Sequence, residues 1–145
     1  MIVRELELRD IDQVCIMEEE AFSMPWHKES FIDMVKNPDA LYLVVEDDNG
    51  VICGCAGALS VLGEGEICNI VVHTDRRGQG YGRVLVSELI TRGRRDFLIE
   101  AFTLEVRVSN DVARRLCESL GFVCEGIRPG FYDKPKEDAA IYWLR

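Results

Sequence analysis

Long apolar runs are absent from this sequence, and residues 1–7 lack the basic-then-apolar order of a secretory signal. Histidine is scarce, since His27 and His73 are the only two and lie in different segments. None of the six cysteines forms a C-x-x-C pair, and Cys53 and Cys55 are expected on one face of a strand. We therefore expect no membrane segment, no metal site and a cytoplasmic location, with reduced and mostly buried thiols.

Positive charge is also in short supply, because 17 lysines and arginines stand against 26 aspartates and glutamates, for a formal net charge of −9. Proteins that bind nucleic acid usually present a basic face, so we expect neither DNA nor RNA as the main partner. The acidic balance favours a basic protein or an amine, although a charge that serves only solubility explains it equally well. The length and the 48% hydrophobic content predict one globular domain over residues 1–145.

The apolar periodicity predicts an alternation of strands and helices along the whole chain. The expected strands are 2–7, 41–45, 51–61, 66–72, 103–108, 122–124 and 139–143. The expected helices begin after Asp10, at about residue 27, at residue 81 and at about residue 110. Asp10 is expected to cap the first helix, with Gln13 completing a capping box. In the last helix, Val112 and Leu116 are expected to face the core. This order predicts an α/β (α+β) fold with a mixed, mostly antiparallel central sheet of six to seven strands and helices on both faces.

The run Arg77-Gly78-Gln79-Gly80-Tyr81-Gly82 stands between a predicted strand and a predicted helix. Its alternating glycines leave backbone N–H groups unshielded at the positive end of a helix dipole, which favours an anionic group such as a pyrophosphate. The run is not a P-loop, since no Gly-Lys-Ser/Thr follows it, and its spacing differs from the Rossmann fingerprint. A glycine-rich surface turn that binds nothing is the alternative.

Five segments in the right order carry a resemblance to a known family. They are 22–26 with Phe31, 66–72, 104–110, 118–122 and 135–139, in addition to Arg77–Gly82, which matches the signature R/Q-x-x-G-x-G/A. On these motifs the chain resembles the GNAT superfamily of N-acetyltransferases over nearly its whole length, and within it the bacterial RimI-like ribosomal-protein-alanine N-acetyltransferases. The resemblance implies a GNAT fold and transfer of an acetyl group from acetyl-CoA to the N-terminal α-amine of a protein, such as ribosomal protein S18.

The resemblance also implies which residues hold the acetyl donor. The backbone of the strand before the glycine turn would pair with the pantetheine arm, at Ile70, Val71 and Val72. The turn would hold the pyrophosphate through Arg77, Gly78, Gln79, Gly80, Tyr81, Gly82 and Arg83. Asn110 matches an asparagine near the cofactor, and it is equally well placed to cap a helix, two roles that are compatible.

For the chemistry, Glu105 matches the family's general base, while an ordinary exposed strand carboxylate is its structural alternative. A peptide α-amine has a pKa of about 7.7–8.0, so a modest base acting through water suffices. Glu66 is a weaker candidate for positioning water or substrate. Trp26 and Phe131 are candidates, by their position, for lining the groove that binds the acceptor peptide. Trp26 could equally well pack the helical region.

One position departs from the family pattern, because Cys117 stands where the family has a tyrosine that protonates the departing CoA. Its side chain is several ångströms shorter than a phenol, so we expect Cys117 to pack beside the cofactor. Tyr132 could then supply the proton, or water could. Two other hypotheses stay open, namely a GNAT enzyme that acetylates a lysine or a small-molecule amine, and a non-catalytic acyl-CoA-binding module.

Overall fold

A computed structural model describes residues 1–145, and the predicted order of elements is confirmed. The strands are β1 (Ile2–Glu5), β2 (Ala40–Glu46), β3 (Ile52–Val61), β4 (Glu64–Val72), β5 (Ala101–Arg107), β6 (Val123–Tyr132) and β7 (Glu137–Leu144). The helices are α1 (Ile11–Ala21), α2 (Lys28–Lys36), α3 (Tyr81–Asp96) and α4 (Asp111–Ser119), with short 3-10 turns η1 (Leu8–Asp10) and η2 (Thr74–Arg76). β6 is much longer than predicted, because it pairs with β7 as far as Tyr132 opposite Glu137.

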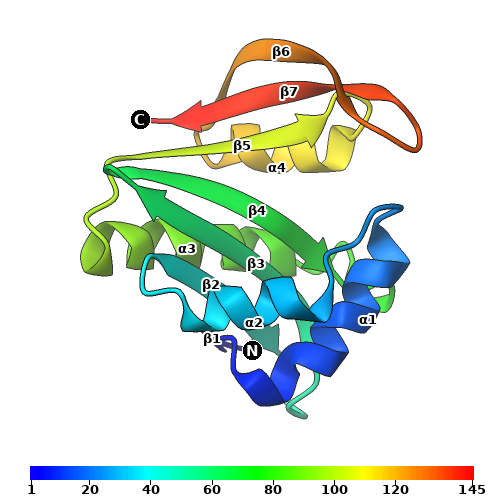
Figure 1. Cartoon of the computed structure of the whole chain (residues 1–145), viewed down its shortest axis with the longest axis vertical. Coiled ribbons are helices and arrows are strands. Elements are labelled where there is room, and N and C mark those ends of the chain that lie inside the picture. The colour runs from blue at the N-terminus through cyan, green and yellow to red at the C-terminus, as the bar shows by residue number, and fades with distance from the viewer.

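The strands form one seven-stranded sheet in the order β1-β2-β3-β4-β5-β7-β6. Every neighbouring pair is antiparallel except β4 with β5, which is parallel. Helices α1 and α2 cover one face of the sheet and α3 covers the other, as Figure 1 shows. The mixed, mostly antiparallel sheet with helices on both faces is thereby confirmed. None of the helices combines the length and the apolar character that a bilayer crossing requires.

The sheet opens between its two central strands. β4 and β5 pair only from Glu64–Glu66 to Ala101–Thr103, and beyond these positions the strands diverge (Figure 1). Further along β4, the register with β3 shifts, so that Asn69 and Ile70 together stand opposite a single residue of β3. Asn69 has a φ of 54°, in the left-handed region that a β-bulge often uses. This bulge turns the backbone of β4 just where it leaves β5.

Two hydrophobic cores fill the space on either side of the sheet. The larger core lies against α3 and α4 and includes Leu85, Leu89, Phe102 and Cys117. The smaller core lies against α1 and α2 and includes Val14, Met17, Phe31 and Tyr42. A strand residue in the smaller core points toward α1 and α2, and one in the larger core points toward α3 and α4. Since side chains alternate along a strand, the direction of the neighbouring side chains of β4 and β5 follows.

Three local expectations were wrong. Val112 is 73% exposed, because α4 directs Ala113 and Cys117 toward the larger core instead. Cys53 and Cys55 lie in different cores, since a bulge between β2 and β3 skips Cys53 in the register and reverses the alternation. Asp10 does not cap α1, because its carboxylate accepts hydrogen bonds from the Glu7 N–H and from Arg4 instead.

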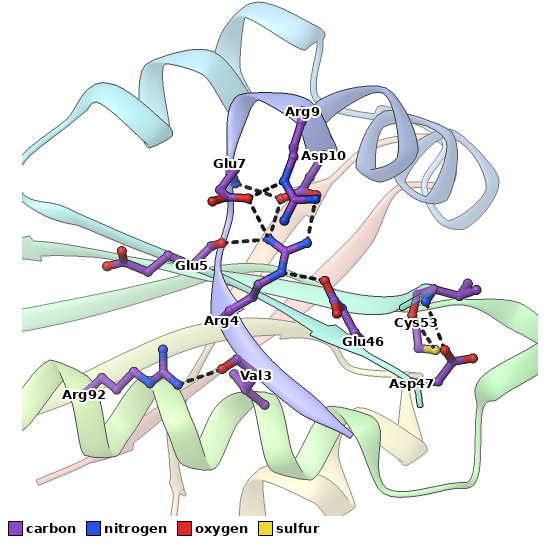
Figure 2. Close-up of polar contacts among 11 residues, drawn as sticks. Val3, Arg4, Glu5, Glu7, Arg9, Asp10, Glu46, Asp47, Cys53 and Arg92 are labelled. Carbon is purple, nitrogen blue, oxygen red and sulfur yellow. Dashed lines mark hydrogen bonds and ion pairs between the residues drawn. The ribbon is translucent and has the colours of Figure 1, made fainter. Parts of the chain in front are cut away.

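Arg4 is the centre of a polar network that ties β1 to its neighbours (Figure 2). Its guanidinium donates to both oxygens of Asp10, at 2.7 and 2.9 Å, and to Glu46 of β2 at 2.6 Å. Burial by itself would raise the pKa of Asp10, but the hydrogen bonds from Arg4 and from the Glu7 backbone lower it overall. The charged form of Asp10 is therefore favoured in the folded protein, and the pair stabilises the start of the chain.

We expect Arg4→Gln to lower the free energy of unfolding at pH 7 by about 2 kcal/mol, because it leaves the buried Asp10 charge without its partner. Since the pKa of Asp10 is lower in the folded state, this contribution is complete above the unfolded value of about 3.9 and is lost as pH falls through the folded value. Urea unfolding from pH 7 to pH 3 should show the difference from wild type shrinking. Arg9→Gln, at a more exposed arginine, is the control, and an equal loss there would contradict the assignment.

Candidate functional site

The glycine turn forms an open cradle at the start of α3. Gly78 and Gly80 have φ values of 76° and 87°, and a Cβ added at either position would meet nothing within 4 Å. Gly80 is the residue from which α3 begins. Free N–H groups of the first helical turn therefore face open space together with the positive end of the helix dipole, an arrangement that fits a phosphate group.

Two arginines flank this cradle and are exposed. Arg77 donates from Nε to the Val72 carbonyl at 3.3 Å, and Arg83 donates to the Ser119 hydroxyl at 2.6 Å. The second contact joins the first turn of α3 to the end of α4. Gln79 is exposed, whereas the Tyr81 side chain is buried in the larger core, so only the backbone of Tyr81 is available at the turn.

The remaining residues expected near the donor have mixed surroundings. In β4, Val71 is buried in the smaller core, while Ile70 and Val72 are half-buried against the larger one. Asn110 caps α4, since its side chain accepts from the Ala113 N–H at 3.1 Å. Cys117 is 2% exposed in the larger core, and burial raises the pKa of its thiol to about 11. It is a neutral packing residue at physiological pH.

Glu105 and Tyr132 belong to strands on the other side of the opening, β5 and β6. Leu104 and Val106 face the larger core, so Glu105 between them faces the α1/α2 side. The Tyr132 phenol has a raised pKa because of burial and the nearby Glu105 charge, which the Arg107 guanidinium partly offsets from 4.4 Å above the ring. The Glu105 charge is thus near enough to influence the Tyr132 phenol.

The β6–β7 hairpin that carries Tyr132 is held rigidly. Arg107 donates to the carbonyls of Asp133 and Pro135 and to the Glu137 carboxylate. Phe131 packs edge-on against Tyr132 with ring centroids 4.9 Å apart, and it is 43% exposed. The hairpin therefore presents a partly exposed aromatic pair, Phe131 and Tyr132.

The candidate acceptor residues lie around the same opening. Trp26 is in the segment 22–27 between α1 and α2, which Figure 1 shows near the diverging end of β4. Its ring packs on Phe31 with centroids 5.4 Å apart, so it packs the helical region. Glu66 is exposed on β4 at the last position that pairs with β5. No cluster of three or more His, Cys, Asp or Glu side chains is arranged to hold a metal ion.

Two residues of this region carried no expectation from sequence. Glu18 on α1 is buried, and its carboxylate accepts a hydrogen bond from Asn69 at the bulge of β4. The sequence did contain a sign of the buried Glu18, because this charged residue interrupts an otherwise apolar stripe of the helix. For Asn69 there was no such signal, since a bulge depends on the pairing of two strands.

The fold and the opening define a class. Two central strands pair briefly and then diverge, and a glycine turn with unobstructed backbone N–H groups lies between the first of them and α3. The model of the Acetyltransferase (GNAT) family matches residues 7–122, which is most of the chain. The chain therefore belongs to the GNAT family of acetyltransferases.

Particular relatives are similar over nearly the whole length. A Bacillus subtilis protein is 37% identical over 98% of this chain and 93% of its own, and its name assigns it provisionally to the ribosomal protein bS18-alanine N-acetyltransferases. The Escherichia coli K12 enzyme of that name is 34% identical over 98% of this chain and 95% of its own. The crystal structure of the E. coli ribosomal-protein-S18-alanine N-acetyltransferase superimposes with a TM-score of 0.88 at 31% identity, covering 99% of this chain and 92% of the other.

We expect Cys117→Ala to leave kcat for acetyl transfer unchanged while it lowers the melting temperature, because it removes a buried sulfur from the core and costs roughly 1 kcal/mol. The measurements are steady-state kinetics and thermal unfolding. Loss of a general acid would instead lower kcat by about 100-fold or more. A loss of that size in a folded variant would return the acid role to Cys117.

Proposed function

We propose that this protein transfers the acetyl group of acetyl-CoA to the N-terminal α-amine of ribosomal protein bS18. The observation that carries this is the position of Glu105 on β5, beyond the pairing of β4 with β5, where its charge also raises the pKa of Tyr132 on the β6–β7 hairpin. Relatives at 34 to 37% identity that bear the bS18-alanine acetyltransferase name support the acceptor.

The donor is held on the α3 side of the opening. The N–H groups from Gly78 to Arg83 take the pyrophosphate, in the cradle that no Cβ obstructs. The backbone of Ile70–Val72 takes the pantetheine arm, because β4 has left β5 there and its inner edge has no strand partner. Bound acetyl-CoA supplies a thioester carbonyl to the acceptor amine, and N–H groups of the chain stabilise the negative charge that develops on its oxygen.

The acceptor amine must lose a proton to become a nucleophile. Glu105 receives this proton through a water molecule, since it faces the acceptor side of β5. An α-amine with a pKa of about 8 is already partly uncharged at neutral pH, whereas lysine near 10.4 is not. A weak carboxylate base is therefore matched to an N-terminus.

The departing thiolate needs a proton, and Tyr132 holds one. Its pKa is raised by burial and by the Glu105 charge, so the phenol stays protonated at neutral pH. Nitrogen forms a bond to the acetyl carbon as sulfur leaves it, and the Tyr132 proton passes to sulfur. The net charge of −9 suits approach of a basic ribosomal protein, and we place the reaction in the cytoplasm, where ribosomes are assembled.

We expect mass spectrometry to find one acetyl group on a peptide with the bS18 N-terminal sequence after incubation with acetyl-CoA. The same peptide with a blocked N-terminus should stay unmodified, even where it contains lysine. Acetylation of the blocked peptide, or of polyamines in preference to the peptide, would favour a lysine or small-molecule acceptor. Tight CoA binding with no turnover on any amine would favour a non-catalytic module.

We expect Glu105→Gln to lower kcat by about 100-fold at pH 7, because the amine loses its proton acceptor. The loss should shrink as pH rises past the amine pKa of about 8, where the nucleophile is already uncharged. Glu64→Gln, at the closed end of the same strand pair, is the control and should retain wild-type kinetics. An unchanged rate with a flat pH response would remove Glu105 from the mechanism.

A further inference from the structure

Glu18, near the C-terminal end of α1, joins two segments of the site. Its Oε1 atom accepts a hydrogen bond from the Trp26 backbone N–H at 3.0 Å and another from the Asn69 side-chain amide at 2.6 Å. Trp26 belongs to the segment 22–27, which we call the acceptor segment, and Asn69 is the left-handed residue of the β4 bulge. One carboxylate oxygen therefore connects the acceptor segment to the strand on the donor side.

The surroundings of Glu18 are unfavourable for a charge. The Glu18 side chain is 2% exposed, and its Oε2 atom is buried without a hydrogen-bond partner in the protein. Burial raises the pKa of Glu18, and the hydrogen bonds from Trp26 and Asn69 offset this only in part. An apolar side chain of similar size would avoid this desolvation, but it would leave the Trp26 N–H and the Asn69 amide without an acceptor.

The groups that surround Glu18 do not supply a compensating charge. Cys55 of β3 and Cys68 of β4 face it, and burial raises the pKa of each thiol to about 12, the Glu18 charge adding to the effect. The Tyr42 phenol of β2 is likewise neutral, because burial places its pKa well above the ordinary value. The carboxylate is held by two hydrogen bonds among neutral neighbours.

Both segments that Glu18 joins have a defined place in the site. The Trp26 ring packs on Phe31 and on Tyr42, with ring centroids 5.4 and 6.4 Å apart. The hydrogen bond from the Trp26 N–H to Glu18 holds the backbone of the same residue. Asn69 shifts the register of β4 and turns the backbone N–H groups that follow it. Movement of either segment would change the distance between acceptor and donor.

We propose that Glu18 is a positioning residue that fixes the acceptor segment and the β4 bulge relative to each other, so that the acceptor amine meets the acetyl donor in the reactive alignment. The proposal rests on the proposed function, since it takes the acceptor to bind beside Trp26. An error of about 1 Å in such an alignment is enough to lower a rate by about 100-fold.

The test compares Glu18→Met with Glu18→Gln. Methionine fills the space but accepts no hydrogen bond, and we expect the peptide KM to rise about tenfold and kcat to fall about tenfold. The KM for acetyl-CoA should rise less than the peptide KM, because the glycine turn proposed for the pyrophosphate does not contact Glu18 and only the Ile70–Val72 backbone follows the bulge. Glutamine keeps an oxygen that can accept both bonds, and its kinetics should remain within about threefold of wild type.

Two further variants separate positioning from general stability. Asn69→Gly keeps the left-handed backbone and removes the amide, so it should change the peptide KM and kcat in the same direction as Glu18→Met. Val14→Ala removes core packing one turn earlier on α1 and should lower the melting temperature while leaving the kinetics unchanged. If Glu18→Met and Asn69→Gly both behave like Val14→Ala, Glu18 is only structural and the proposal is wrong.

A readout independent of the acceptor keeps the two proposals apart. In a Trp143→Phe background, Trp26 is the only tryptophan, and acrylamide quenching of its fluorescence reports how firmly the acceptor segment is held. We expect Glu18→Met to raise the quenching constant about twofold and Glu18→Gln to leave it unchanged. Should wild type fail to acetylate the bS18 peptide while the quenching still rises, the acceptor assignment is wrong and the positioning stands. Unchanged quenching together with unchanged kinetics overturns the positioning role.

Discussion

The site depends on the short pairing of β4 with β5, which run parallel for three residue pairs and then separate. Each strand stays hydrogen-bonded to its antiparallel neighbour on the outer side, β3 for β4 and β7 for β5, as far as residues 72 and 107. The divergence therefore leaves the sheet intact while it exposes the inner edge of both strands. Backbone groups on such an edge need partners, and a ligand arm with amide groups can supply them.

Polar contacts hold the elements around this divergence in place on both faces of the sheet. On the α3/α4 face, Arg83 contacts Ser119 and so links the helix that follows β4 to the helix that follows β5. On the α1/α2 face, Glu18 links the acceptor segment to the bulge at Asn69. Core packing sets the distance between the helices and the sheet. The directional hydrogen bonds set the orientation of the segments around the opening between β4 and β5.

The sequence predicted what depends on local pattern and missed what depends on pairing. The order of elements along the chain and the glycine turn at Gly78 and Gly80 follow from periodicity and residue type, and the structure shows both. The bulge at Asn69 could not be predicted, because it arises from the register between β3 and β4. The full length of β6 was missed for the same reason, and with it the hairpin contacts that bring Tyr132 beside Glu105.

The closeness of Glu105 and Tyr132 has a chemical consequence for their proposed roles. While Glu105 is ionised, its charge helps to keep the Tyr132 pKa high and the phenol protonated, against the opposing effect of Arg107. Once Glu105 has accepted the proton of the amine, its negative charge no longer disfavours ionisation of the Tyr132 phenol. The Arg107 guanidinium, 4.4 Å from the centre of the Tyr132 ring, then lowers the pKa of the phenol without that opposing effect. Release of the Tyr132 proton then becomes easier at the stage when the thiolate departs. The proposed base and the proposed acid are thus coupled by their electrostatic interaction, in the order that the proposed reaction requires.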